Sequence, residues 1–293
     1  MSFPTPDVGS GVLADVAFGA DPGRWPLPVA HTCEELWLRA VGAGGQGRYA
    51  VARADLAQLM RAENPGRWRS LALSAQASFI RQLGWHWRAH DLDGRSWAAS
   101  GGDPEAGVDA LSGLAADALG VGRLAASAAL LARAEELTGD GVPDRQSVRL
   151  AWVHAELAMA SGDGPAAVRH ARRAVELAAR VQPTPQRHRV KSAVVLAAAL
   201  CCAGDVDGAR EVAETALTET EIHRLVPLRW ALACLLSDIG SRPHGPASIA
   251  VVRDRSAQVV TRRGGQWKVR EVPVAASADI VTSWSQPSEL PHP

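Results

Sequence analysis

The chain has 293 residues with 31 basic and 31 acidic side chains, so its formal net charge is zero. This balance excludes a general electrostatic attraction to nucleic acid or to a membrane surface. The N-terminus has no basic flank or apolar core of the signal-peptide kind, and the longest apolar run, 193–203, is too short to cross a bilayer. The four cysteines form no C-x-x-C pair and are expected to be reduced thiols. We therefore expect a cytoplasmic protein.

The chain begins with residues 1–29, where frequent glycine and proline predict an irregular lead-in. From about residue 30 to 241 apolar residues recur with the helical period, and the alternation of β-strands is missing. We predict five helix pairs and one unpaired helix in this domain. The pairs are 31–43 with 47–63, 67–83 with 86–100, 105–119 with 122–138, 145–161 with 165–181, and 187–203 with 206–223, and the unpaired helix is 226–239.

A ladder of glycines marks these pairs. The first helices run into Gly45, Gly84, Gly120, Gly162 and Gly204, at spacings of 39, 36, 42 and 42 residues. A period of about 20 to 50 residues is typical of a stacked array, and each glycine can supply the left-handed residue that ends a helix. Alanines follow four of the glycines at fixed offsets on one helical stripe. They are Ala50, Ala54, Ala57, Ala125, Ala129, Ala132, Ala167, Ala171, Ala174, Ala209, Ala213 and Ala216. The second pair departs from this pattern, with Asp93 and Ser96 in the stripe.

Two of these segments carry a resemblance to a known family. Leu196-Ala197 through Cys202-Ala203-Gly204-Asp205 to Ala209, Ala213 and Ala216-Leu217 resembles a tetratricopeptide (TPR) repeat, and so does Ala155 through Gly162-Asp163 to Ala167, Ala171 and Ala174. The resemblance covers about 31–240. It implies an all-α fold, an α-α solenoid of about five helix-turn-helix repeats closed by a capping helix. The repeat length is similar to that in the sensory arms of large bacterial transcription regulators.

The resemblance also implies a concave groove for a partner. In that family the position ten residues before the glycine faces the groove, which here gives Trp152 and Trp230. The Lys and Asn set that clamps a peptide carboxylate in chaperone-binding relatives is not present, so that ligand is not predicted. The groove is expected to carry Arg39, Arg81, Asp117, Arg149, Trp152, Glu156, Lys191 and Trp230.

The pattern changes after Pro243, where β-branched residues alternate and Gly264-Gly265 is typical of a tight turn. We predict a short β-hairpin region over 242–275, with strands near 257–262 and 267–272 and a third near 248–253. Residues 276–293 are predicted to be disordered. The predicted hairpin region is basic, which is compatible with contacts to the phosphates of nucleic acid or with a solvated strand face. Its basic residues are Arg253, Arg255, Arg262, Arg263, Lys268 and Arg270.

Three further patterns suggest chemistry. Residues 42–47 spell G-x-G-x-x-G, but the preceding residues predict a helix and not the strand that a dinucleotide site needs. His86 and His90 have metal-ligand spacing, with Asp91 and Asp93 nearby and no evident third ligand. Basic residues at 187–191 open a helix, where positive charge is mildly unfavourable; a partner acid would explain them, and so would chance. We predict no cofactor and no metal.

These observations favour a non-enzymatic protein–protein interaction or scaffold module that binds a protein or peptide on the concave face, without nucleic acid or membrane. The alternative is a regulatory protein whose array senses a partner and whose basic C-terminal region contacts nucleic acid or the transcription machinery. A third hypothesis, an enzyme with a metal on His86, His90 and Asp93, has only the histidine spacing in its favour.

Overall fold

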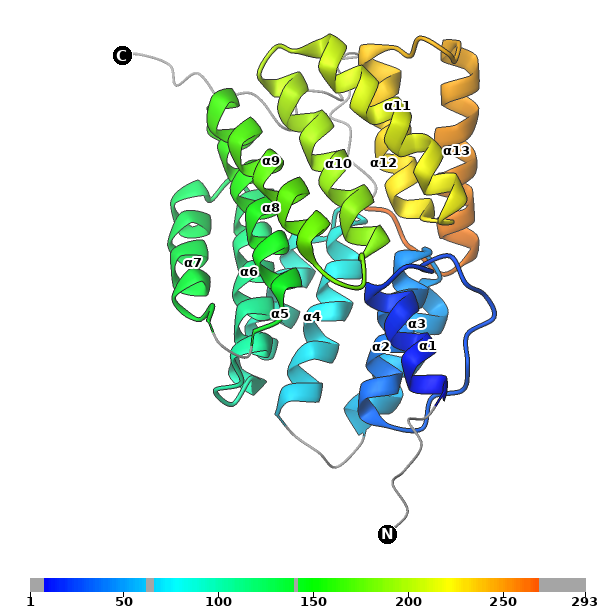
Figure 1. The fold of residues 1–293 in the computed structure, drawn as a ribbon. Coiled ribbons are helices and arrows are strands. Elements are labelled where there is room, and N and C mark those ends of the chain that lie inside the picture. The colour runs from blue at the N-terminus through cyan, green and yellow to red at the C-terminus, as the bar shows by residue number, and fades with distance from the viewer. Residues whose placement is uncertain (1–7, 62–65, 140–141, 269–293) are drawn as a thin grey trace.

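The computed structural model describes residues 8–61, 66–139 and 142–268, and in these ranges every regular element is an α-helix (Figure 1). The helices are α1 (Val8–Phe18), α2 (Cys33–Gly45), α3 (Tyr49–Arg61), α4 (Arg67–Arg81), α5 (His86–Ala99), α6 (Pro104–Gly120), α7 (Leu124–Glu136), α8 (Asp144–Ala160), α9 (Gly164–Arg180), α10 (Gln186–Cys202), α11 (Val206–Ile222), α12 (Val226–Ile239) and α13 (Pro246–Arg262). The all-α class is confirmed for this part of the chain. None of the helices in these ranges is long and apolar enough to span a bilayer.

Helices α2 to α11 form the five predicted pairs, with ends shifted by a few residues. Local signals explain where several of them begin. Asp103, Asp163 and Asp205 precede α6, α9 and α11, and each accepts a hydrogen bond from a backbone N–H of the first turn. Such a cap satisfies a donor that has no partner inside the helix.

Consecutive pairs pack on one another in two layers. The first helices α2, α4, α6, α8, α10 and α12 form a row in which each contacts the next, and we call this row the inner layer. The second helices α3, α5, α7, α9 and α11 each pack against their own partner and the following first helix. Figure 1 shows this succession from the blue N-terminal pair to the orange C-terminal pair.

The two ends of this array meet. The Ala50 N–H donates to the carbonyl of Arg263 (2.9 Å), and the Arg263 guanidinium donates to the carbonyl of Gln46 (2.7 Å). A little further on, the Lys268 N–H donates to the carbonyl of Leu83 (2.8 Å). The segment that follows α13 therefore fastens the last helix pair to the first two, as the orange trace in Figure 1 shows.

The left-handed glycines correct the predicted ladder in two places. They are Gly47, Gly84, Gly122, Gly162 and Gly204, with φ between +72° and +91°. Gly45 and Gly120 are instead the last residues of α2 and α6, so the prediction was wrong in the first and third pairs. A second glycine, Gly47 or Gly122, follows two residues after each of these helix ends. The spacing of the ladder alone does not tell which of the two glycines is left-handed.

The same shift of two residues corrects the alanine stripe. In α9 and α11 the alanines of the stripe are buried, whereas in α3 and α7 they are mostly exposed. There the buried positions lie two residues later, at the same offsets from Gly47 and Gly122 that hold for the other glycines. They are Ala52, Leu56 and Leu59 in α3, and Ser127, Leu131 and Ala134 in α7. In α5 the offsets give Ala89, Asp93 and Ser96, all fully buried, so two polar residues occupy the stripe of that helix.

The expectation of an irregular lead-in over 1–29 is wrong for residues 8–18, which form α1. Leu13, Val16 and Ala17 lie at helical spacing and are buried, and α1 packs against α2 and α10. The N-terminal segment therefore lies against the first helices of two distant pairs.

The expected β-hairpin in 242–275 is also wrong where the structure describes it, because residues 246–262 form α13. This helix pairs with α12, which is therefore not an unpaired cap. Ile249, Ser256 and Val260 are its buried residues, at helical spacing, and Gly264 (φ +92°) follows its end. The alternating valines that suggested a strand also fit a helix whose other face is exposed. The predicted tail 276–293 and most of the strand 267–272 lie outside the described residues.

Candidate functional site

The residues expected in a groove lie in separate places of the inner layer. Arg39 in α2 makes a two-pronged ion pair with Asp55 in α3, with Nε–Oδ2 at 2.9 Å and Nη2–Oδ1 at 2.6 Å. This planar match between a guanidinium and a carboxylate is the strongest form of the contact. Arg39 thus joins the two helices of its own pair.

Arg81 in α4 is the centre of a buried charge cluster. Its Nε donates to Asp117 Oδ1 at 2.6 Å, and its guanidinium also pairs with Asp93. Both carboxylates are almost fully inaccessible. Burial raises the pKa of Asp93 well above its usual range, and the neighbouring Asp117 adds to this although Arg81 opposes it. The cluster joins α4, α5 and α6.

The aromatic residues of the expected groove are partnered too. Trp152 in α8 donates from Nε1 to the Ser192 hydroxyl (2.8 Å), and its ring stacks on His188 with centroids 5.2 Å apart. Next to it Lys191 in α10 lies 3.3 Å from a carboxylate oxygen of Glu156 in α8. These contacts join α8 to α10.

Trp230 in α12 packs on Trp267 with ring centroids 4.3 Å apart. Trp267 belongs to the segment that follows α13, so this position of the expected groove is covered by the protein's own chain.

Arg149 borders a small cavity where five first helices and α1 converge. Its volume is about 40 Å³, enough for roughly three water molecules at about 10–15 Å³ each. We call it the central cavity. It is lined by Phe18, Trp37, Val41, Ser74, Ala75, Ser78, Phe79, Asp109, Arg145, Gln146, Arg149 and Arg187.

The N-terminal helix contributes Phe18 to this site. Its ring lies 5.3 Å from that of Trp37 and 5.9 Å from that of His188, measured between centroids. The guanidinium of Arg145 lies over it at 4.5 Å, a distance at which a cation is attracted to the face of an aromatic ring. A segment from outside the helix pairs therefore occupies the inner layer.

The electrostatics of the central cavity are unusual for a protein interior. Burial and the neighbouring Arg149, Arg67 and Arg187 lower the pKa of Arg145 to about 9. Burial and Arg149 lower the pKa of Arg187 to about 10. Both groups remain charged at neutral pH, and the shifts measure how unfavourable it is to gather these cations away from water.

Sequence reasoning found Arg149 and missed Phe18, Arg145 and Gln146. Phe18 lies in a segment expected to be irregular, and the burial of Arg145 and Gln146 depends on the packing of α8 against α6 and α10. The basic start of α10 was the one signal in the sequence, since Arg187 comes from it.

The basic residues assigned to the predicted C-terminal hairpin region do not form one cluster. Arg255 and Arg262 are exposed on α13, Arg253 pairs with Asp254 (2.9 Å), and Arg263 is bonded to the carbonyl of Gln46. The side chain of Lys268 is exposed. Arg270 lies outside the described residues.

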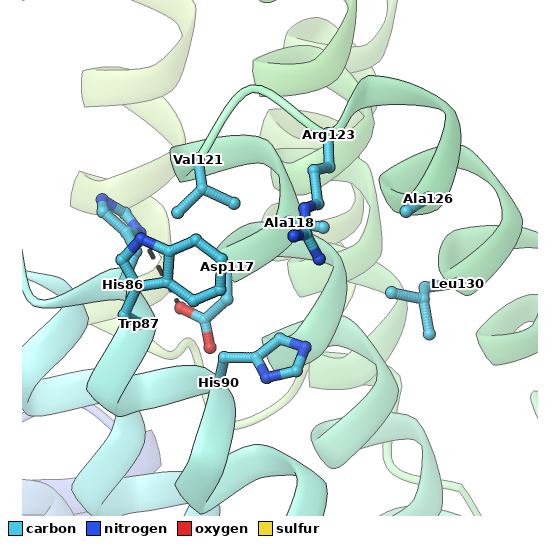
Figure 2. A pocket seen from close by; sticks show the side chains of 9 residues that line it. All are labelled: His86, Trp87, His90, Asp117, Ala118, Val121, Arg123, Ala126 and Leu130. Atoms are coloured by element: carbon cyan, nitrogen blue, oxygen red, sulfur yellow. Dashed lines mark ion pairs between the residues drawn. The ribbon is translucent and has the colours of Figure 1, made fainter.

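A second pocket, of about 60 Å³, lies between α5, α6 and α7 and contains the predicted histidine pair (Figure 2). His86 Nδ1 is 3.7 Å from Asp117 Oδ1, and His90 lines the same pocket. Gly120 packs directly on the imidazole of His86, where a side chain would collide with the ring. Asp117 also lines this pocket and faces the histidines, but its carboxylate is paired with Arg81, as is that of Asp93. In the described ranges no three His, Cys, Asp or Glu side chains are placed to hold a metal ion.

Comparison with known proteins adds little to this geometry. No family model matches the chain. No curated protein matches it at a significant level. One solved structure to which it is similar is the crystal structure of BtubC (BKLC) from P. vanneervenii, with 14% sequence identity and a TM-score of 0.42, over 85% of this chain and 99% of that one. At this level the similarity carries no argument about function. The class that can be stated is an all-α array of helix pairs.

Proposed function

We propose that the chain is a non-enzymatic protein–protein interaction module, a TPR-like α-α solenoid whose inner layer binds a protein or peptide segment. The strongest support is that two segments of the chain itself, the end of α1 and the segment after α13, already pack on side chains of the inner layer. Phe18 packs on Trp37, His188 and Arg145, and Trp267 packs on Trp230.

We expect a partner segment to replace α1 on the inner layer. Tryptophan and arginine are enriched among the residues that contribute most to binding. Tryptophan buries a large area with few rotatable bonds, and the planar guanidinium of arginine stacks on aromatic rings. An inner layer that holds the Phe18 ring between an arginine and a tryptophan offers the same anchors to an aromatic residue of a partner. A row of packed first helices also provides the extended surface that repeat arrays use. A partner would displace α1, whose main contacts are with α2 and α10.

Affinity capture from native lysate tests the proposal with three full-length baits. Phe18→Ala is expected to capture more partner than the unchanged chain, because α1 competes less well for the inner layer. Arg149→Ala is expected to capture less, because Arg149 borders the space that Phe18 leaves when a partner displaces α1. The matched control is Arg172→Ala, since Arg172 is exposed on the outer side of α9.

The unfolding midpoint of each bait is measured, so that a loss of fold is separated from a loss of binding. Identical captured proteins and amounts from the Phe18, Arg149 and Arg172 variants would rule out binding on the inner layer.

A further inference from the structure

The central cavity gathers more positive than negative charge. Its lining contains three arginines, Arg145, Arg149 and Arg187, and one acid, Asp109. Asp109 Oδ1 lies 2.9 Å from Arg149 Nη2. Arg145 pairs with Glu105, which does not line the cavity and which also pairs with Arg67, and Arg67 pairs in turn with Asp103. The side chains that line the cavity therefore carry a net charge of two positive units.

Several polar atoms of these side chains have no hydrogen-bond partner among the described residues. Gln146 is fully buried, and neither its amide nitrogen nor its amide oxygen makes a hydrogen bond within this part of the chain. Arg145 is 8% exposed, and its Nη1 is unpartnered in the same ranges. The Nε atoms of Arg149 and Arg187 add two more donors of this kind. Trp37 Nε1 and the ion-paired Asp109 Oδ1 also make no hydrogen bond in this part of the chain. Buried polar groups are normally hydrogen-bonded, so these lining residues indicate a built site for a polar ligand.

The fold positions these groups together. Arg145, Gln146 and Arg149 lie within slightly more than one turn of α8, and Arg187 comes from the first turn of α10. Gly45 at the end of α2 makes room for Arg187, because a Cβ there would lie 2.8 Å from Arg187 Cδ. Ser74 and Ser78 of α4 also line the cavity. The donors thus reach the cavity from several helices.

We propose that the central cavity binds a small divalent oxyanion, hydrogen phosphate itself or the phosphate group of a small monoester, through Arg145, Arg149 and Arg187. Guanidinium forks match the oxygens of phosphate in pairs. A dianion balances the two net positive charges of the lining. The cavity of about 40 Å³ admits a group of this size and no peptide. This site goes beyond the proposed function and does not depend on it, because the ligand binds the chain without a partner.

Binding to the unchanged full chain is the first test. Equilibrium dialysis with radiolabelled inorganic phosphate is expected to saturate at one phosphate per chain. In a thermal unfolding series phosphate is expected to raise the midpoint in a saturable manner, because a ligand of the folded state alone stabilises it. Chloride at the same ionic strength is the control. No retained label, or an equal rise with chloride, would overturn the proposal.

The variant Arg187→Gln locates the binding. It is expected to weaken phosphate binding by about tenfold or more, the effect of losing one charge-assisted contact. The exposed Arg172→Gln is expected to bind as the unchanged chain does. Equal binding by the two variants would overturn the assignment to this cavity. If Arg187→Gln does not fold, Ser78→Asp is used in its place, because it puts a negative charge on the lining of the cavity. It is expected to weaken phosphate binding to the same extent. Ser78→Ala is its uncharged control.

Competition with glycerol phosphate distinguishes the two sources of the anion. Displacement of the label at a similar concentration would support a monoester ligand, and failure to displace it would support the free ion.

Discussion

Replacing Arg81 by methionine is expected to destabilise the fold by about 3–5 kcal/mol near pH 8, the usual cost of removing one partner from a buried ion pair. Asp93 and Asp117 would remain as two buried carboxylates with no cation between them. Methionine keeps most of the length of the side chain, so the loss reports the charge and not a cavity.

The effect is expected to depend on pH. Burial already raises the pKa of Asp93 well above its usual range, and without Arg81 the pKa rises further. A carboxyl group with a raised folded-state pKa binds more protons in the folded than in the unfolded state. Its destabilising effect is therefore greatest at high pH and decreases as the pH falls through the folded-state pKa. The loss in the free energy of unfolding caused by Arg81→Met should therefore be clearly smaller at about pH 5.5 than at about pH 8.

Urea unfolding at the two pH values measures this, with Arg172→Met as the exposed control for loss of an arginine. A loss below about 1 kcal/mol at both pH values would fit a surface ion pair and contradict a buried cluster.

Replacing Gly264 by alanine is expected to open the contact between the two ends of the array and to cost about 2–5 kcal/mol. Gly264 has φ +92°, a conformation that costs an L-residue about 1–2 kcal/mol. A Cβ there would also lie 2.7 Å from the Cβ of Ala50 and 3.0 Å from its nitrogen, and overpacking of this kind adds about 1–3 kcal/mol.

Gly122→Ala is the matched control, because Gly122 has φ +77° and a Cβ at this position would meet no atom of the described residues within 4 Å. It shares the backbone strain and lacks the collision. Hydrogen exchange distinguishes the two variants. The Ala50 amide, bonded to Arg263, and the Lys268 amide, bonded to Leu83, are expected to lose protection in Gly264→Ala and to keep it in Gly122→Ala. Equal protection in both variants would show that the ends are not held together by this segment.

The predicted helix pairs between residues 31 and 223 depended on local signals, which explains why they agree with the structure. Glycines end first helices, and acids such as Asp163 and Asp205 cap second helices. These effects act within one turn of the chain. The errors arose where a local pattern had two solutions. Valines such as Val251 and Val259 fit a strand and one face of α13 equally well, and only packing on α12 selects the helix.

The candidate site was less accessible to sequence reasoning. Trp152 could be selected because the position ten residues before the glycine faces the groove in the family that the sequence resembles, and Arg149 was assigned to the same face of that helix. Phe18 and Arg187 approach them from distant parts of the chain, and no spacing in the sequence relates these positions. The separate ion pairs of Arg39 and Arg81 likewise depend on which neighbouring helix supplies the acid.

Helical periodicity and chain breakers alone determined that this protein is built of successive helix pairs, since those signals reflect backbone geometry within a few residues. Tertiary structure decided which of two neighbouring glycines is left-handed, that α1 and the segment after α13 cover inner-layer residues, and that three arginines meet at one cavity. Each of these depends on contacts between residues far apart in the chain, whose free energy is gained only when the whole array packs together.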